Sequence, residues 1–497
     1  MSKTRVVLVG AAAISAAGQG QQTREAWELM RDAAIAAAAD AGSAELLSRI
    51  DSIRVPKGMW NYSDPARLIA RAIGVPAAHT TLADIGILQT SLLAEACDAI
   101  QSGNEQVALV AGGEAKYRQL LGDKAGQPAF ETPQTEAPDH FEQPEAELWS
   151  QAEWAHGLGM PVTYYALMEN ALRYEQGQSL AEHRQTIAAL WADFNAVAGR
   201  NPDAWFPEPM TAAELIGGSA TNRRLAYPYA KWHTSQWNVD QAAALLLCSE
   251  SVADELGIAA DKRVYPLAIA ESNHMATVST RKDMHRCPGY ALAMQRALSL
   301  SGVVRKDIRH AELYSCFPVA VRIQAREMDL PEGMPLTQTG GMSFAGGPLN
   351  NFVYQSLVKM IEVLRKHPGD VGLVTAVSGM LTKQGVSLWS SAQPAHGFAY
   401  ADVSGEVRDS TRLCEVIEEA RGPAVVATYT VLYDKAGAPA CGVIVADLPD
   451  GRRTVAHTDD AGLVSAMLDQ EFCGVAIELG DGNVFTAPNA PCMNGRA

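Results

Sequence analysis

The segment LYSCFP (313–318) carries two side chains that can do chemistry, Tyr314 and Cys316. A tyrosine hydroxyl can donate a hydrogen bond or exchange a proton, and an ionised thiol can act as a nucleophile. The segment is polar where packing alone would favour aliphatic residues, which supports a functional interpretation. The alternative is that a tyrosine and a buried cysteine simply fill space.

Two histidines are further candidates for catalysis: His233 in YAKWHTSQWN and His274 in ESNHMATVST. His274 directly follows an apolar stretch that we expect to form a strand, and His233 precedes another. The alternative for each is a structural histidine satisfied by its surroundings. The 11 histidines are scattered and the 8 cysteines include no Cys-x-x-Cys pair, so neither a metal site nor a disulfide framework is expected.

The glycine-rich segment ELIGGSATNRR (214–224) ends in two cations, Arg223 and Arg224. Guanidinium groups bind phosphate well, so this loop is a candidate site for a ligand phosphate. No P-loop or Rossmann spacing of glycines accompanies it, and a solvated turn explains the segment equally well.

The chain has 497 residues, of which 47% are apolar and 19% charged. This length predicts more than one domain, and the composition is typical of a well-buried globular protein. The formal charge is -16 and no Lys/Arg-rich run occurs. Nucleic acid and anionic membranes bind positively charged protein surfaces, so neither is expected as a partner.

The N-terminal stretch MSKTRVVLVGAAAISAAG has two interpretations. It resembles a secretory signal, with two cations before an apolar run, but it also fits a buried strand from Val6 to Val9 that runs into a Gly/Ala turn. We favour the strand, and with it a cytoplasmic protein. No stretch approaches the length of a membrane-spanning helix.

Two distant segments share one plan, residues 88–115 and 350–379. In each, apolar residues at helical spacing end at a glycine or a Pro-Gly pair, and a short all-apolar strand follows. Such strands are typical of a sheet that is covered on both faces. We therefore predict two similar α/β halves in one chain.

The halves are expected to be separated and followed by extra structure. Residues 116–236, rich in Gln, Glu, Pro and Trp, are predicted to be a large insertion on one side of the sheet. After residue 395 the pattern changes to short strands with Asp/Gly turns, which predicts an antiparallel sheet or barrel. The predicted domains are therefore 1–262 (including the insertion), 263–395 and 396–497.

Five sequence blocks resemble, in order, the conserved blocks of the thiolase superfamily: TLADIGILQTSLLAEACDAIQSG, WNVDQAAALLLCSES, AELYSCFPV, TGGMSFAGGPLNN and VTAVSGMLTKQG. The resemblance spans roughly residues 5–395. It is greatest for the sterol-carrier-protein thiolase branch and, more narrowly, for thiolase-like proteins of type 1, which carry a C-terminal β-barrel. It implies a duplicated thiolase fold of αβαβα layers followed by an antiparallel β-barrel domain.

The resemblance also implies where catalytic residues should stand, and most of them are missing. Gly86 occupies the position of the nucleophilic cysteine, and no Cys, Ser or Thr lies between Asp84 and Gln89. Gly347 replaces the histidine of the Gly-His-Pro loop, and Val377 replaces the second cysteine. In the fourth block, Tyr314 stands where the sterol-carrier branch has histidine.

The resemblance therefore implies a protein that binds an acyl-CoA or related thioester without the ordinary thiolase reaction. It implies no tightly bound cofactor; coenzyme A thioester would be the ligand, with Arg223 or Arg224 at its phosphates. One alternative is a diverged acyltransferase or retro-aldolase that uses Tyr314, with Cys316, His274 or His233. Another is a non-catalytic subunit of a lipid-pathway complex, with a protein partner bound through the C-terminal domain. The oligomeric state stays open.

Overall fold

The computed structural model describes residues 4–18, 24–146 and 148–487. The first half forms a six-stranded sheet in the order β1-β8-β4-β2-β3-β5. Its strands are Val6–Ser15, Asp240–Ser249, Val107–Ala115, Ser52–Pro56, His79–Ala83 and His140–Glu142. The stretch that resembled a secretory signal thus contributes an edge strand, β1, which pairs with β8.

The second half repeats this arrangement. Its sheet has the order β10-β11-β12-β9-β13, with strands Ile308–Glu312, Val371–Ser378, Lys383–Ser390, Tyr265–Ser272 and Ala399–Asp402. In the first half, β8 lies between β1 and β4 and pairs antiparallel with both. In the second half, β12 lies between β9 and β11 in the same way. The predicted duplication is therefore visible in the strand order. β13 extends the second sheet to Asp402, beyond the boundary drawn at residue 395.

Two helices fill the space between the sheets, α4 (Gln89–Ser102) and α14 (Phe352–Lys366). One hydrophobic cluster joins their apolar faces to strands of both sheets. α4 ends at Gly103 in a left-handed conformation, as the sequence predicted. The outer faces are covered by α1 (Ala26–Ala41) and α3 (Pro65–Ala72) on the first sheet and α11 (Gly289–Ser301) on the second. These are the predicted αβαβα layers.

The insertion is mainly helical and spreads over several parts of the molecule. Its elements are α5 (Lys116–Lys124), β5, α6 (Gln151–Ala155), α7 (Pro161–Glu175), α8 (Leu180–Ala198), α9 (Ala212–Leu215), β6 (Arg224–Ala226) and β7 (Tyr229–Ala230). α8 begins at a capping box formed by Ser179 and Glu182. β5 closes the free edge of β3, whereas β6 pairs with the C-terminal sheet.

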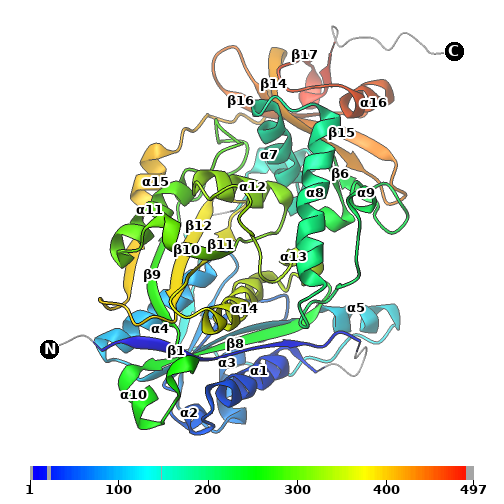
Figure 1. Cartoon of the computed structure of the whole chain (residues 1–497). Coiled ribbons are helices and arrows are strands. Elements are labelled where there is room, and N and C mark those ends of the chain that lie inside the picture. Colours follow the sequence, from blue (N-terminus) through cyan, green and yellow to red (C-terminus); the bar gives the residue numbers. More distant parts are fainter. Residues whose placement is uncertain (1–3, 19–23, 147, 488–497) are drawn as a thin grey trace.

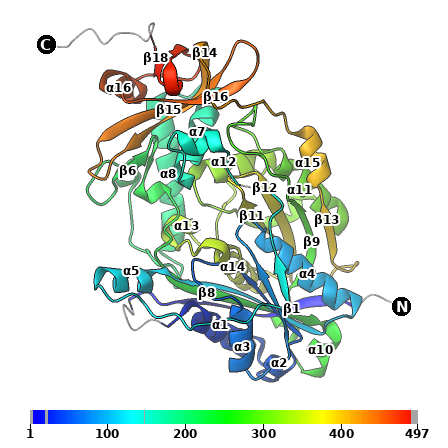
Figure 2. The same ribbon diagram turned by 180° about the vertical axis from the view of Figure 1, so that it is seen from behind.

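The C-terminal domain is an antiparallel sheet in the order β16-β15-β14-β17-β18. Its strands are Arg453–Thr458, Pro439–Asp447, Gly422–Tyr433, Ala476–Leu479 and Phe485–Thr486, with α16 at Ala461–Asp469. A single bridge between His457 and Val484 links the two ends of this order, so a closed barrel stays a prediction. Figures 1 and 2 show the sheet at one end of the molecule, against α7 and α8.

The C-terminal sheet is joined to the insertion by buried polar contacts. The Asn170 side chain of α7 donates to the carbonyl of Tyr429 at 2.8 Å, and Arg173 of α7, which is fully buried, forms an ion pair with Glu471. The domain therefore completes the fold of the insertion instead of lying apart from it.

Candidate active site

Three loops meet at the N-terminal end of α4. Gly86 lies in the loop before α4, and Gly347 lies before α14, while Val377 is near the end of β11. The Gln89 side chain donates to Oδ1 of Asn350 at 2.9 Å, which ties the starts of the two central helices together. From the other side, Lys383 Nζ donates to the carbonyl oxygen of Gly86 at 2.8 Å.

The backbone at Gly86 leaves no place for a catalytic side chain. Its φ is +108°, a conformation that residues with a Cβ rarely adopt. A Cβ built there would lie 3.0 Å from Cγ of Pro144 and 3.7 Å from Leu148, both in the insertion. The insertion therefore fills the space where the resemblance would place a thiol.

Gly347 is enclosed even more tightly. A Cβ at this position would come 1.9 Å from Oγ of Ser235, and the Gly347 N–H donates to the Gln236 carbonyl at 2.9 Å. A side chain at this position would require the Ser235 hydroxyl to rotate away and would still lie close to Cβ of Ser235, at 3.2 Å. Val377 is buried, and its strand partner is Gln384 of β12. Its side chain is an alkyl group, so it can pack but cannot transfer a proton.

The loop that follows Val377 is held by a buried arginine. Residues 379–381 all have positive φ, and the Arg281 guanidinium donates to the carbonyl of Met380 at 2.8 Å. Arg453 of the C-terminal sheet in turn donates to the Lys282 carbonyl at 3.1 Å. The C-terminal domain is thus connected to the site by two successive arginine contacts.

Tyr314 and Cys316 lie close to the start of α14. The Tyr314 N–H donates to Oγ1 of Thr375, and its ring meets Phe352 edge-on at 5.8 Å. Burial raises the pKa of the Tyr314 hydroxyl, so it remains a hydrogen-bond donor at neutral pH. Burial also raises the pKa of the Cys316 thiol to about 12, which makes it a poor nucleophile.

The two candidate histidines lie in different places. His233 is buried; its Nδ1 accepts from the Ala230 N–H at 3.2 Å, and burial lowers its pKa to about 4, so it is neutral. Two residues later, the Ser235 N–H donates to the Cys316 carbonyl. His274 follows β9, and its carbonyl accepts from Thr382 at 3.3 Å. Burial lowers its pKa as well.

Arg223 and Arg224 lie at the edge of the insertion that faces the C-terminal sheet. Both are exposed, and the strand that begins at Arg224 pairs through Ala226 with Leu432 of β14. Among the described contacts, none links either arginine to the three loops around α4. Their role as phosphate ligands stays a prediction.

Sequence reasoning missed a group of charged residues beside Gly86. Glu271, at the end of β9, is buried and accepts hydrogen bonds from Thr90, Ser91 and Tyr400. Burial raises its pKa, although these hydrogen bonds oppose the shift. The available signal was a carboxylate near the end of a largely apolar strand, Glu271 in YPLAIAES, and a lysine at the start of another strand, Lys383 in KQGVSLWS.

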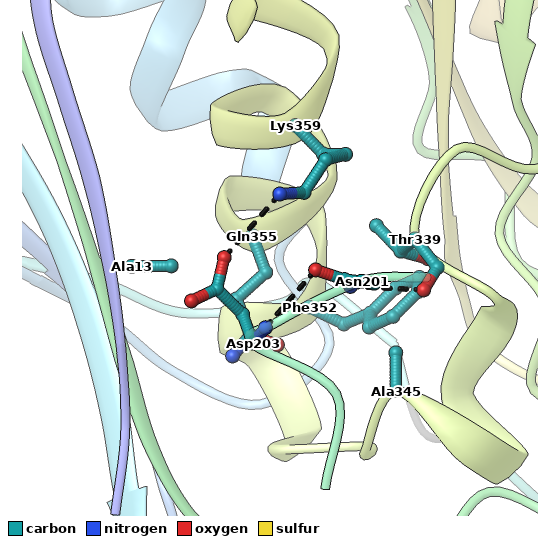
Figure 3. Close-up of a pocket in the computed structure, with 8 residues that line it drawn as sticks. All are labelled: Ala13, Asn201, Asp203, Thr339, Ala345, Phe352, Gln355 and Lys359. Atoms are coloured by element: carbon teal, nitrogen blue, oxygen red, sulfur yellow. Dashed lines mark hydrogen bonds and ion pairs between the residues drawn. The ribbon is translucent and has the colours of Figure 1, made fainter. Parts of the chain in front are cut away.

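A small pocket borders the Gly347 loop on the side of β1. Figure 3 shows the residues that line it: Ala13, Asn201, Asp203, Thr339, Ala345, Phe352, Gln355 and Lys359. The Asn201 side chain donates to the Thr339 carbonyl at 2.9 Å, and Lys359 pairs with Asp203 at 3.4 Å. Its one lysine is therefore already paired. Within the described ranges, no three His, Cys, Asp or Glu side chains are placed to hold a metal.

Comparison with solved structures shows what this architecture resembles. A crystal structure of a monomeric SCP2-thiolase-like protein type 1 from Mycobacterium smegmatis is 28% identical, with a TM-score of 0.82, and the match covers 98% of this chain and 100% of that one. The chain is thiolase-like. The family model described as the additional C-terminal domain of thiolase-like protein type 1 matches residues 402–483, which confirms the predicted resemblance.

More distant thiolase-like relatives share the fold alone. Human mitochondrial 3-ketoacyl-CoA thiolase is 16% identical, with a TM-score of 0.58 over 78% of this chain and 99% of that one. An Ltp2-ChsH2(DUF35) aldolase is 18% identical, with a TM-score of 0.60 over 79% and 99%. Among curated proteins, an acetyl-CoA acetyltransferase of Methanocaldococcus jannaschii is 25% identical over 181 residues, 36% of this chain. That match spans only 43% of the relative's own length.

The carboxyl group of Glu142 in β5 is expected to make the stability of the protein depend on pH. Burial, followed by the nearby carboxyls of Glu95 and Glu271, raises the pKa of Glu142 from 4.5 to about 7. Its stabilising contribution is complete below the ordinary value of 4.5 and is lost as the pH rises through about 7. In Glu142→Gln the side chain stays neutral. Between roughly pH 5 and 8, wild type should therefore lose on the order of 1 kcal/mol relative to the variant.

Urea unfolding at a series of pH values measures this difference. The exposed Glu419→Gln serves as the matched control and should follow wild type at every pH. A constant difference between wild type and E142Q across the range would contradict the assignment.

Proposed function

We propose that the protein binds an acyl-CoA or a related thioester at the loops that converge on α4, and that it does not carry out the thiolase reaction. The observation that carries this proposal is that glycine stands at positions 86 and 347, with a φ of +108° at Gly86 that disfavours any side chain there and Pro144 3.0 Å from where its Cβ would lie. Covalent thioester chemistry requires an activated nucleophile with a base in reach. Neither position can supply one.

The relatives support the ligand class. The chain is similar to a thiolase-like protein of type 1 and to an acetyl-CoA acetyltransferase, and human mitochondrial 3-ketoacyl-CoA thiolase, which shares the fold, has been solved in complex with CoA. We therefore propose coenzyme A thioesters as ligands, with no tightly bound cofactor. We also propose a cytoplasmic location; no helix in the described part of the chain is long and apolar enough to cross a membrane.

Acetoacetyl-CoA plus CoA should give no thiolysis above background, as followed by loss of the 3-ketoacyl thioester absorbance. The double variant Gly86→Cys/Gly347→His should also fail to gain activity, because the φ of +108° at position 86 is unfavourable for cysteine and its Cβ would press on Pro144. Native mass spectrometry of the purified protein should nevertheless show a retained CoA thioester. Thiolysis at thiolase-like rates would overturn the proposal.

A binding titration with acetyl-CoA adds a control for the phosphate contact. Arg223→Ala should weaken binding if the 214–224 loop holds a CoA phosphate, whereas the exposed Arg421→Ala should not. Equal affinities of wild type and Arg223→Ala for acetyl-CoA would show that Arg223 does not bind the ligand. They would not contradict the proposed ligand class.

The second candidate function is a diverged acyltransferase or retro-aldolase that uses Tyr314. The position of Tyr314 favours this function, because its half-buried ring lies against Phe352, the first residue of α14. Its hydroxyl is protonated at neutral pH and can therefore donate a hydrogen bond. Tyr314→Phe should then lower kcat for cleavage of a 3-hydroxyacyl-CoA by about 100-fold. Tyr117→Phe is the matched control. Full activity in Y314F would exclude this role.

The remaining candidate is a subunit that binds a protein partner through the C-terminal domain. The Ltp2-ChsH2(DUF35) structure pairs a thiolase-fold chain with another protein, which gives this proposal its motive. Co-purification from the native source should bring down a stoichiometric partner that competes with an antibody to residues 402–483. Recovery of the chain alone would count against it.

A further inference from the structure

Two histidines face each other where the insertion meets the C-terminal sheet. His156 directly follows α6, and His457 lies in β16. Their Nδ1 atoms are 3.1 Å apart, and the centroids of their rings are 5.2 Å apart. At this distance the two nitrogens can share one proton in an N–H···N hydrogen bond, in which one ring donates and the other accepts. The contact therefore requires at least one of the two rings to be neutral.

The elements packed around this pair carry few groups that could balance a second positive charge. Their charged and titratable side chains are Glu153 of α6, Arg453, Asp459 and Asp460 at the two ends of β16, Asp447 and Cys441 of β15, and Glu418 and Asp481 on the segments along the other edge of β16. Burial, and after it the charge of His457, lowers the pKa of His156, and none of these carboxylates opposes that shift. Protonation of both rings at once is therefore unfavourable while they stay in contact.

A second histidine pair in the chain shows the contrast. The ring centroids of His310 and His367 are 5.3 Å apart, which is close to the spacing of the first pair. There, however, Nε2 of His310 lies 2.9 Å from Oδ2 of Asp370. A carboxylate at hydrogen-bonding distance stabilises a protonated imidazole. Acidification should therefore weaken the contact between His156 and His457 and leave the second pair in place.

The first pair joins two elements that hold the same segment of the chain. From α6, the buried Glu153 side chain accepts hydrogen bonds from the N–H and the hydroxyl of Ser279, at 2.7 and 2.8 Å. From β16, Arg453 donates to the carbonyl of Lys282 at 3.1 Å. Segment 279–282 is thus fixed from both sides only while α6 and β16 stay together.

Arg281, in the middle of that segment, connects it to the candidate site. Its guanidinium donates to the carbonyls of Met380 at 2.8 Å and Ala276 at 2.9 Å. Met380 and Leu381 both have positive φ, a conformation that costs energy in residues with a side chain and persists only where surrounding contacts hold it. Separation of α6 from β16 would therefore loosen the loop at residues 379–381.

We propose that His156 and His457 form a pH-sensitive contact between the insertion and the C-terminal sheet, which opens on acidification and releases the loop at residues 379–381. At neutral pH at least one ring is neutral, and the pair is closed. As the pH falls below the ordinary histidine pKa of about 6.5, both rings become cationic, lose their shared hydrogen bond and repel each other. Because the pKa of His156 is lowered in the folded state, its stabilising contribution is complete above 6.5 and is lost below that value. This inference goes beyond the proposed function and does not depend on it.

The experiment measures amide hydrogen exchange of the full-length protein by mass spectrometry at about pH 7.5 and about pH 5, after correction for the intrinsic pH dependence of exchange. Protection of the peptides that cover residues 151–158, 279–282 and 379–384 should fall on the order of tenfold at the lower pH, equivalent to one pKa unit of repulsion. Peptides of α4 should stay protected, because the hydrophobic cluster around that helix carries no part of the contact.

Two variants give the result its control. His457→Gln keeps a hydrogen-bonding side chain but cannot become cationic, so its protection should be the same at both pH values. His310→Gln, in the second pair, is the matched control and should lose protection at residues 151–158 as wild type does. If H457Q does not fold, the wild-type exchange at the two pH values still decides the question. Unchanged protection in wild type, an equal acid-induced loss in H457Q, or a loss spread over the whole chain would overturn the proposal.

Discussion

The structure depends on two helices, α4 and α14, that are buried between two sheets. Their apolar faces share one hydrophobic cluster with strands of both halves, and each fully buried Leu or Ile there contributes about 1.5–3 kcal/mol relative to an exposed one. Because both helices are fixed along their whole length, the loops that lead into them are fixed as well. The Gln89–Asn350 hydrogen bond locks the two helix starts together.

This constraint explains how the fold persists without the usual catalytic groups. In a close-packed interior, a position vacated by a side chain is filled by its neighbours. Pro144 lies close to Gly86 and the Ser235 hydroxyl lies close to Gly347, so a larger residue at either position requires its neighbour to shift. The site holds two buried ionisable residues, each satisfied by hydrogen bonds: Lys383 by the Gly86 carbonyl, and Glu271 by Thr90, Ser91 and Tyr400.

The insertion and the C-terminal sheet are packed and hydrogen-bonded against the two halves. The insertion supplies β5, which closes the edge of the first sheet beside β3, and β6, which pairs with the C-terminal sheet. Arg453 and Arg281 carry contacts from the C-terminal sheet to the loop after Val377. A change in how that sheet packs would therefore reach the site through main-chain hydrogen bonds and not through a flexible linker.

Much of this could be predicted from the sequence. Helical spacing of apolar residues followed by an all-apolar strand identified α4 with β4 and α14 with β11, because those periodicities are set by local geometry. Five blocks in order indicated the thiolase resemblance, and short strands separated by Asp/Gly turns predicted the antiparallel C-terminal sheet. Barrel closure, the assignment of β13 to the second sheet, and the attachment of β6 to the C-terminal sheet depend on pairings between distant residues, which no local pattern reports.

The sequence by itself also determined that residues 86, 347 and 377 are glycine, glycine and valine; that they stand at the catalytic positions of a thiolase stays a prediction from the resemblance. Only the tertiary structure decided what stands there instead. Lys383 and Gly86 are 297 residues apart, and Glu271 reaches α4 across 180 residues. Such contacts arise from the packing of one half on the other, because a buried ionisable side chain needs a hydrogen-bond partner and that partner can come from a distant part of the chain.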